Sequence, residues 1–115
     1  MNTINKPISW NTQDFEQGKV KITPLAQNTF AKEIQILMAK DGVMKEHKAP
    51  FPISVQVLKG KIWFEVEGER FVLEALDMIA LQANVPHSLG GLEDSIVRLS
   101  LAQSDSVVRV KTLLT

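Results

Sequence analysis

The feature that most constrains the fold is a series of short segments in which apolar and polar residues alternate. In residues 53–58 the apolar Ile53, Val55 and Val57 alternate with Ser54, Gln56 and Leu58, and similar alternation recurs at 34–39, 62–67 and 96–101. Turn-forming Gly, Pro, Asn and Asp residues separate these segments. A period of two predicts strands with one buried face, and strands at this spacing are typical of a sandwich or barrel. The sequence therefore predicts an all-β fold.

The regions outside these strands give a weaker signal. Residues 1–29 are polar and irregular, with one possible short strand at 19–22, and a last apolar segment covers 107–114. No composition change or low-complexity stretch suggests a linker. We therefore predict a single domain over 1–115, with an irregular N-terminal segment at 1–29 and a barrel core at about 30–115.

Composition excludes several classes of function. The 115 residues include 13 Lys and Arg against 13 Asp and Glu, so no net positive charge is available to attract nucleic acid or an anionic membrane. There is no cysteine, which rules out disulfides, thiolate nucleophiles and thiolate-bound zinc. No apolar stretch is long enough to cross a bilayer, and the N-terminus lacks a signal-like apolar core, so we expect a cytoplasmic protein.

Two motifs identify a family. The first is Gly42-x4-His47-x-Ala49-x3-Ile53-x6-Gly60, and the second runs from Asp77 to His87 with the ending Val-Pro-His. Together they resemble the two motifs of the cupin superfamily, over roughly residues 30–102. The proline-containing stretch 49–58 is similar to that of small bacterial single-domain cupins of the conserved-barrel (cupin-2, RmlC-like) type, in which this loop replaces the usual ligand run.

The resemblance implies a double-stranded β-helix, which is a jelly-roll barrel open at one end, and usually a homodimer. Asn84 stands where the family has a glycine, and asparagine is a suitable replacement where φ is positive. Leu76 also stands at a glycine position, before the second-motif aspartate. That second departure has no explanation in the sequence and leaves the shape of the turn at 73–77 open.

The same resemblance raises the question of a metal. Metal-binding cupins use three histidines and a glutamate, and the first and last histidines correspond to His47 and His87, the only two in the chain. Ala49 and Ile53 occupy the positions of the second histidine and the glutamate. A stable divalent site needs at least three protein ligands. We therefore expect no tightly bound metal, with Zn, Fe, Mn or Ni at His47 and His87 as the alternative.

Each histidine also has a simpler interpretation. His47 lies in a charged Lys-Glu-His-Lys run that is typical of a surface, and His87 follows a proline in a loop. If both instead line the barrel, they would be polar anchors in a pocket otherwise formed by apolar residues such as Ile53, Val55 and Phe64. The aliphatic residues could equally be plain barrel core.

Three functions follow from these alternatives. The first is a protein that binds a small organic molecule, with or without catalysis. The second is a metal-dependent enzyme of dioxygenase or isomerase type that uses His47 and His87, and the third is a structural or interaction module with a filled barrel. Trp63 falls on the opposite strand face from Ile62 and Phe64, where it either contacts a second subunit or folds over its own sheet.

Overall fold

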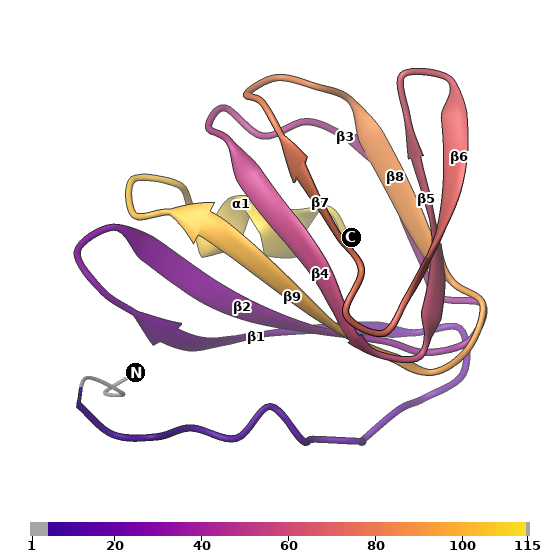
Figure 1. Ribbon diagram of the computed structural model, residues 1–115, viewed down its shortest axis with the longest axis horizontal. Coiled ribbons are helices and arrows are strands. Elements are labelled where there is room, and N and C mark those ends of the chain that lie inside the picture. Colours follow the sequence, from indigo (N-terminus) through magenta and orange to yellow (C-terminus); the bar gives the residue numbers. More distant parts are fainter. Residues whose placement is uncertain (1–4, 115) are drawn as a thin grey trace.

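The computed structural model describes residues 5–114, which fold into two antiparallel β-sheets and one short helix (Figure 1). The elements in this part of the chain follow in order: β1 (Val20–Gln27), β2 (Ala31–Met38), β3 (Val43–His47), β4 (Ile53–Lys59), β5 (Lys61–Val66), β6 (Glu69–Glu74), β7 (Met78–Leu81), β8 (His87–Gly91), β9 (Ser95–Ala102) and α1 (Val107–Thr112). The predicted all-β class is confirmed.

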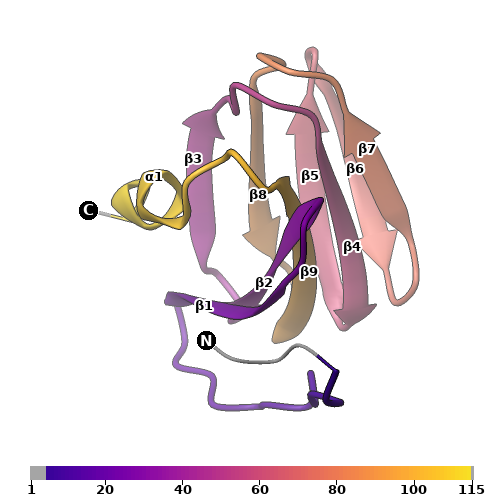
Figure 2. The same cartoon turned by 90° about the vertical axis from the view of Figure 1, so that its left-hand side faces the viewer.

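The two sheets face each other as the walls of a barrel. One has the strand order β1-β2-β9-β4-β7 and the other the order β3-β8-β5-β6. Strands that are distant in the sequence are neighbours, because β2 and β4 both pair with β9 and β3 pairs with β8. In Figure 2 the helix α1 lies beside β3 and near β1, where the edges of the two sheets are not hydrogen-bonded to each other.

The core fills the space between the sheets, as the alternation predicted. Ile53, Val55 and Val57 of β4 are buried, and so are Ile62 and Phe64 of β5. Ser54 and Gln56 are only partly buried, since they lie on the outer face of the same strand. The inward faces of β4 and β5 are therefore the faces that the sequence pattern indicated.

The prediction of an irregular segment at 1–29 is wrong for most of residues 20–27, and the possible short strand at 19–22 is the start of a longer one. These residues form β1, which pairs with β2 from Val20↔Met38 to Gln27↔Lys32. The register shifts between Pro24 and Ala26. Proline cannot donate a backbone hydrogen bond, and an irregularity on an edge strand accommodates it. The barrel therefore starts about ten residues before the predicted boundary near 30.

Residues 107–112, left unassigned within the predicted barrel core, form the helix α1. Ser106 is its N-cap, and the Ser106 side chain accepts a hydrogen bond from the backbone N–H of Arg109. Asp105 and Arg109 form an ion pair one turn apart. Val110 is buried against the barrel interior, which anchors the helix to the sheets.

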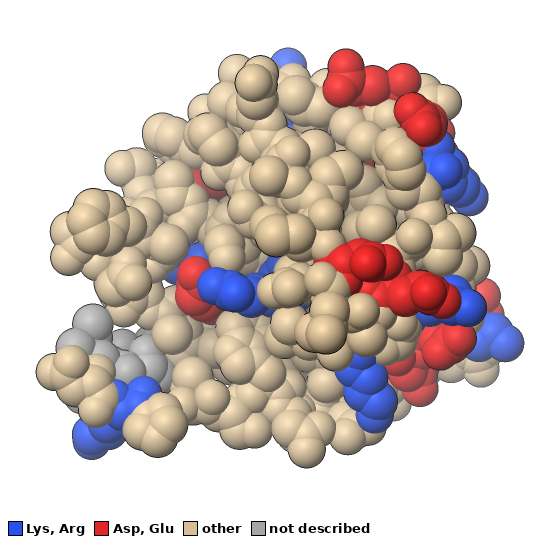
Figure 3. All heavy atoms as spheres, in the orientation of Figure 1, with Lys and Arg blue, Asp and Glu red and all other residues tan. Residues whose placement is uncertain are grey.

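Two global properties agree with the composition. No helix in residues 5–114 is long and apolar enough to cross a membrane. On the face drawn in Figure 3, basic and acidic side chains lie next to one another without a large region of one sign. That distribution matches the balance of 13 basic and 13 acidic residues.

Candidate ligand-binding site at the barrel mouth

The two histidines meet at one end of the barrel. His47 ends β3 and His87 begins β8, and these two residues are register partners in the sheet. Their ring centroids are 4.2 Å apart, with an interplanar angle of 63°. The fold therefore brings together two residues that are forty positions apart in the sequence.

Backbone carbonyl groups fix the tautomer of both imidazoles. His47 Nδ1 lies 2.6 Å from the carbonyl oxygen of Lys45, and His87 Nδ1 lies 2.9 Å from that of Val85. A carbonyl oxygen only accepts, so each Nδ1 carries the proton and donates it. In the neutral imidazole each Nε2 is then a hydrogen-bond acceptor or a metal-ligating atom.

The surroundings favour the neutral form of both rings. Burial lowers the pKa of His47 below its ordinary value, and the positive charges of His87 and Arg109 lower it further, although the Lys45 carbonyl opposes the shift. Burial likewise lowers the pKa of His87. The hydrogen bond to the Val85 carbonyl raises this pKa, and the positive charge of Arg109 lowers it further. Uncharged imidazoles therefore face the barrel interior at neutral pH.

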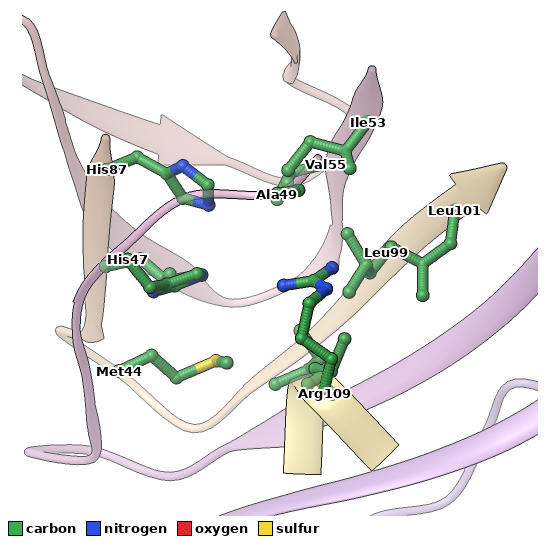
Figure 4. Close-up of a pocket in the computed structure, with 12 residues that line it drawn as sticks. Met44, His47, Ala49, Ile53, Val55, His87, Leu99, Leu101 and Arg109 are labelled. Atoms are coloured by element: carbon green, nitrogen blue, oxygen red, sulfur yellow. The ribbon is translucent and has the colours of Figure 1, made fainter. Parts of the chain in front are cut away.

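The histidines line a small cavity whose other walls are mostly apolar. Its volume is about 20 Å³, and both sheets and the helix contribute to it. The residues around it are Ile36, Met44, His47, Ala49, Ile53, Val55, His87, Leu89, Leu99, Leu101, Arg109 and Val110 (Figure 4). This space holds about one water molecule. In the observed arrangement the barrel mouth is nearly filled.

Arg109 is the site residue that the sequence reasoning missed. It projects from α1 into the cavity, on the side opposite the two imidazoles (Figure 4). Its Nε and Nη2 atoms each lie 2.8 Å from an oxygen of Asp105, whose side chain is only 1% exposed. The available signal was the spacing of four residues between Asp105 and Arg109 on either side of the polar cap residue Ser106, because oppositely charged residues at this spacing are typical of a helix start.

The predicted pocket residues divide into two groups. Ile53 and Val55 line the cavity together with His47 and His87. Phe64 is not among the lining residues, because it is fully buried behind His87, with the two rings stacked at 5.6 Å and nearly parallel. Phe64 therefore orients the His87 ring from the core instead of facing the cavity.

The donor set does not fit the divalent metal that the fold family implies. Residues 5–114 contain no group of three His, Cys, Asp or Glu side chains that could hold one. Ala49 and Ile53 lie beside the histidines as cavity walls, and neither has a ligating atom. The guanidinium of Arg109 also places a positive charge in the same cavity, which opposes a dication.

Trp63 lies on the outer face, as predicted, and the structure accounts for its contacts within one subunit. A side chain added at Gly90 would collide with the Trp63 indole, so the ring lies directly over that glycine. The guanidinium of Arg70 covers the ring at 4.0 Å from its centroid. Trp63 therefore folds over its own sheet and gives no independent support for a subunit interface.

Comparison with known proteins supports the fold and no more specific relationship. No protein-family model matches the sequence, and no curated protein matches it significantly. A cupin superfamily protein from Desulfitobacterium hafniense matches 77% of this chain over 82% of its own length, with 15% identity and a TM-score of 0.71. An RmlC-like cupin from Shewanella frigidimarina matches 80% of this chain over 82% of its own, with 21% identity and a TM-score of 0.69.

A third similar structure is an enzyme. Salicylate 1,2-dioxygenase from Pseudoaminobacter salicylatoxidans matches 74% of this chain, but only over 23% of its own length, with 16% identity and a TM-score of 0.61. The antiparallel barrel and these neighbours together show that the chain has the β-barrel fold of cupins. Its two motif histidines meet at the barrel mouth, as the resemblance implied.

Proposed function

We propose that this protein binds a small organic molecule at the barrel mouth, without a tightly held metal. The observation that carries the proposal is the His47–His87 pair, in which carbonyl groups hold both Nδ1 atoms and leave the Nε2 atoms available. Polar groups that converge in an apolar cavity are typical of a small-molecule site.

The cavity volume determines how binding would occur. A cavity of about 20 Å³ is far below the roughly 300 Å³ or more of a typical ligand site, so α1 has to move outward or the ligand has to be very small. The same closed mouth is what a purely structural barrel would have. A structural role, however, gives no reason to turn two imidazoles and a guanidinium toward one cavity.

A fragment screen by NMR tests this proposal. Histidine side-chain signals would be recorded in the metal-free protein while a library of small polar fragments is added. We expect some fragments to shift the His47 and His87 signals, and the H47N/H87N variant to lose their binding. A screen in which no fragment perturbs either ring would favour the structural module.

The alternative is a metal-dependent enzyme of dioxygenase or isomerase type. The adjacent imidazoles favour it, because a histidine whose Nδ1 donates to a carbonyl is a common metal ligand through Nε2. Elemental analysis of protein purified without a histidine tag separates the two functions. Near-stoichiometric Zn, Fe, Mn or Ni that disappears in H47A or H87A would support the enzyme and refute the metal-free site.

A homodimer in the cytoplasm completes the proposal. The homodimer rests on the resemblance to cupins alone, since Trp63 is covered by Gly90 and Arg70 of its own chain. Light scattering at micromolar concentration measures the assembly directly. A mass close to 12.8 kDa would mean a monomer and would refute it.

A further inference from the structure

The cavity at the barrel mouth combines one cation, two hydrogen-bond acceptors and an aliphatic wall. We infer that its ligand is a small carboxylate that carries a hydroxyl group on the neighbouring carbon and a short aliphatic body. This inference rests on the proposed function and names its ligand class. Each part of the ligand is matched by a different part of the site.

Arg109 recognises the carboxylate. Asp105 occupies the Nε and Nη2 edge of the guanidinium, and no hydrogen bond within residues 5–114 reaches Nη1. Nη1 is therefore available as a donor at the cavity that Arg109 lines. Hydrogen bonds between a guanidinium and a carboxylate are among the strong ones in a partly desolvated site. Asp105 meanwhile holds the arginine in position without using its whole donor capacity.

The histidine pair recognises the hydroxyl. Both Nδ1 atoms donate to backbone carbonyl groups, so the Nε2 atoms of the neutral rings are acceptors only. An acceptor repels a carboxylate oxygen and attracts an O–H group. The ligand thus needs a hydrogen donor close to its carboxylate, because the guanidinium and the imidazoles line the same small cavity.

The walls set the rest of the ligand. Ile53, Val55, Leu99 and Leu101 border the cavity on its aliphatic side. Their apolar surface fits one or two methyl groups, and the positive guanidinium of Arg109 in the same cavity disfavours a second cation, such as the ammonium group of an amino acid. Phosphate esters are also disfavoured, since a single guanidinium that is already paired offers too few donors for a dianion.

Ligand entry requires movement of α1. The helix has six residues, and the contacts that attach its start to the barrel include the buried Val110 and a hydrogen bond from Lys32 Nζ to the carbonyl of Asp105 at 2.6 Å. A short helix held mainly by Val107, Val110 and Leu113 opens at a lower free-energy cost than a core strand. Because Arg109 lies on α1, an outward shift would enlarge the cavity while the carboxylate remains bound to the helix.

A panel of four related compounds tests the inference. Lactate, propionate, lactamide and alanine would each be titrated to about 50 mM into the protein at constant ionic strength, because so small a ligand binds weakly. NMR signals of His47, His87 and Arg109 would report occupancy. We expect lactate to bind about fivefold to tenfold more tightly than propionate, which lacks the hydroxyl, and about tenfold or more tightly than lactamide, which lacks the charge. Alanine should bind more weakly than lactate.

Matched variants assign the charge recognition to Arg109. The D105N/R109Q double variant removes the guanidinium without leaving a buried, unpaired carboxylate, and it should lower lactate affinity by about tenfold or more. The E33Q/R98Q variant is the control, because the Glu33–Arg98 pair lies on the outer face of the sheet. It should bind lactate like the unmodified protein. Equal loss in both variants, or no loss in D105N/R109Q, would overturn the role of Arg109.

The outcomes distinguish failure of this inference from failure of the proposed function. If none of the four compounds binds but neutral fragments still shift the His47 and His87 signals, the ligand class is wrong and the binding site remains. If propionate or lactamide equals lactate, the corresponding half of the recognition is wrong. If neither the panel nor any fragment reaches the histidines, both proposals are refuted.

Discussion

The two ends of the barrel are closed in different ways. At one end, tight turns bring main-chain atoms into close contact. Ser95 is fully buried there, and its hydroxyl donates to the carbonyl of Glu93 at 2.8 Å and accepts from the N–H of Lys61 at 2.9 Å. Gly60 packs directly against Ser95. At the other end, the Arg109 and Val110 side chains of α1 close the cavity that the histidine pair lines. We call these the packed end and the mouth.

The difference separates a permanent closure from one that can open. At the packed end even one added methyl group meets main-chain atoms, which cannot move without disturbing the sheets. At the mouth the closure depends on Arg109, Val110 and a short helix. The barrel is therefore fixed by main-chain packing at one end, whereas its closure at the mouth depends on the side chains of one short helix.

The largest expected effect is at the packed end. Gly60 has a φ of 93°, and a Cβ there would collide with Ser95 Oγ and the carbonyl oxygen of Asp94. The G60A variant should lose about 3–4 kcal/mol of unfolding free energy, from the left-handed backbone together with the overpacking. Urea denaturation measures this loss.

Gly18 provides the matched control for G60A. It also has a positive φ, 75°, but a Cβ there would meet no atom within 4 Å. G18A should therefore lose only about 1 kcal/mol, which isolates the backbone contribution. Equal losses in the two variants would mean that close packing at Gly60 contributes nothing.

The next effect concerns the ion pair at the mouth. R109Q leaves the buried carboxylate of Asp105 without its charged partner but with the Ser106 N–H, and we expect a loss of about 2–3 kcal/mol. R98Q removes the outer-face pair with Glu33, which is more exposed, and should lose no more than about 1 kcal/mol. D105N/R109Q should recover much of the R109Q loss. Denaturation curves that show equal losses for R109Q and R98Q would contradict this difference in burial.

The mouth should also give stability a specific pH dependence. Burial lowers the pKa of both histidines in the folded protein below the 6.5 of the unfolded chain. As the pH falls below 6.5, the unfolded state therefore binds more protons than the folded state. The stability that the two neutral histidines contribute is complete above that pH and is lost as the pH falls toward their folded pKa values. Urea midpoints should decrease between about pH 7 and 5.

The carboxylates at the two pairs act in a different pH range. Although burial opposes the shift, hydrogen bonds from Arg98 and Ser100 lower the pKa of Glu33 from 4.5, and those from Arg109 and the Ser106 backbone lower that of Asp105 from 3.8. The stability that Glu33 and Asp105 contribute is therefore lost only below pH values of 4.5 and 3.8.

The H47N/H87N variant tests whether the histidines cause the change between about pH 5 and 7. Its urea midpoints should be nearly constant over that range, and an unchanged slope would assign the effect to other groups.

The sequence predicted those parts of the fold in which local pattern and burial agree. The inward face of β4, the outward position of Trp63 and the meeting of His47 and His87 follow from a period of two or from the motif frame. Strand β1 was missed over most of its length because Pro24 interrupts its alternation at an irregular edge. Its pairing depends on contacts with β2 that no local pattern reveals.

The part of the site on α1 could not be predicted for a similar reason. Residues 107–110 include three valines, which favour a strand by propensity, while the helix depends on the Ser106 cap and on packing of Val110 in the barrel. Arg109 enters the cavity only because this helix covers the gap between β1 and β3. A site completed by tertiary packing has no signature at the level of spacing.

The smallest expected effect compares one left-handed residue from each end. Leu76 is 74% exposed with a φ of 77°, and Asn84 near the mouth has a φ of 66°. Leucine loses free energy in this region of φ, whereas asparagine tolerates it. L76G should therefore raise the unfolding free energy by about 0.5–1 kcal/mol, because an exposed leucine has little buried surface to lose. N84G should change the unfolding free energy by less than about 0.5 kcal/mol. Thermal and urea denaturation of both variants measure the difference, and a destabilised L76G would mean that the Leu76 side chain contributes contacts outside this subunit.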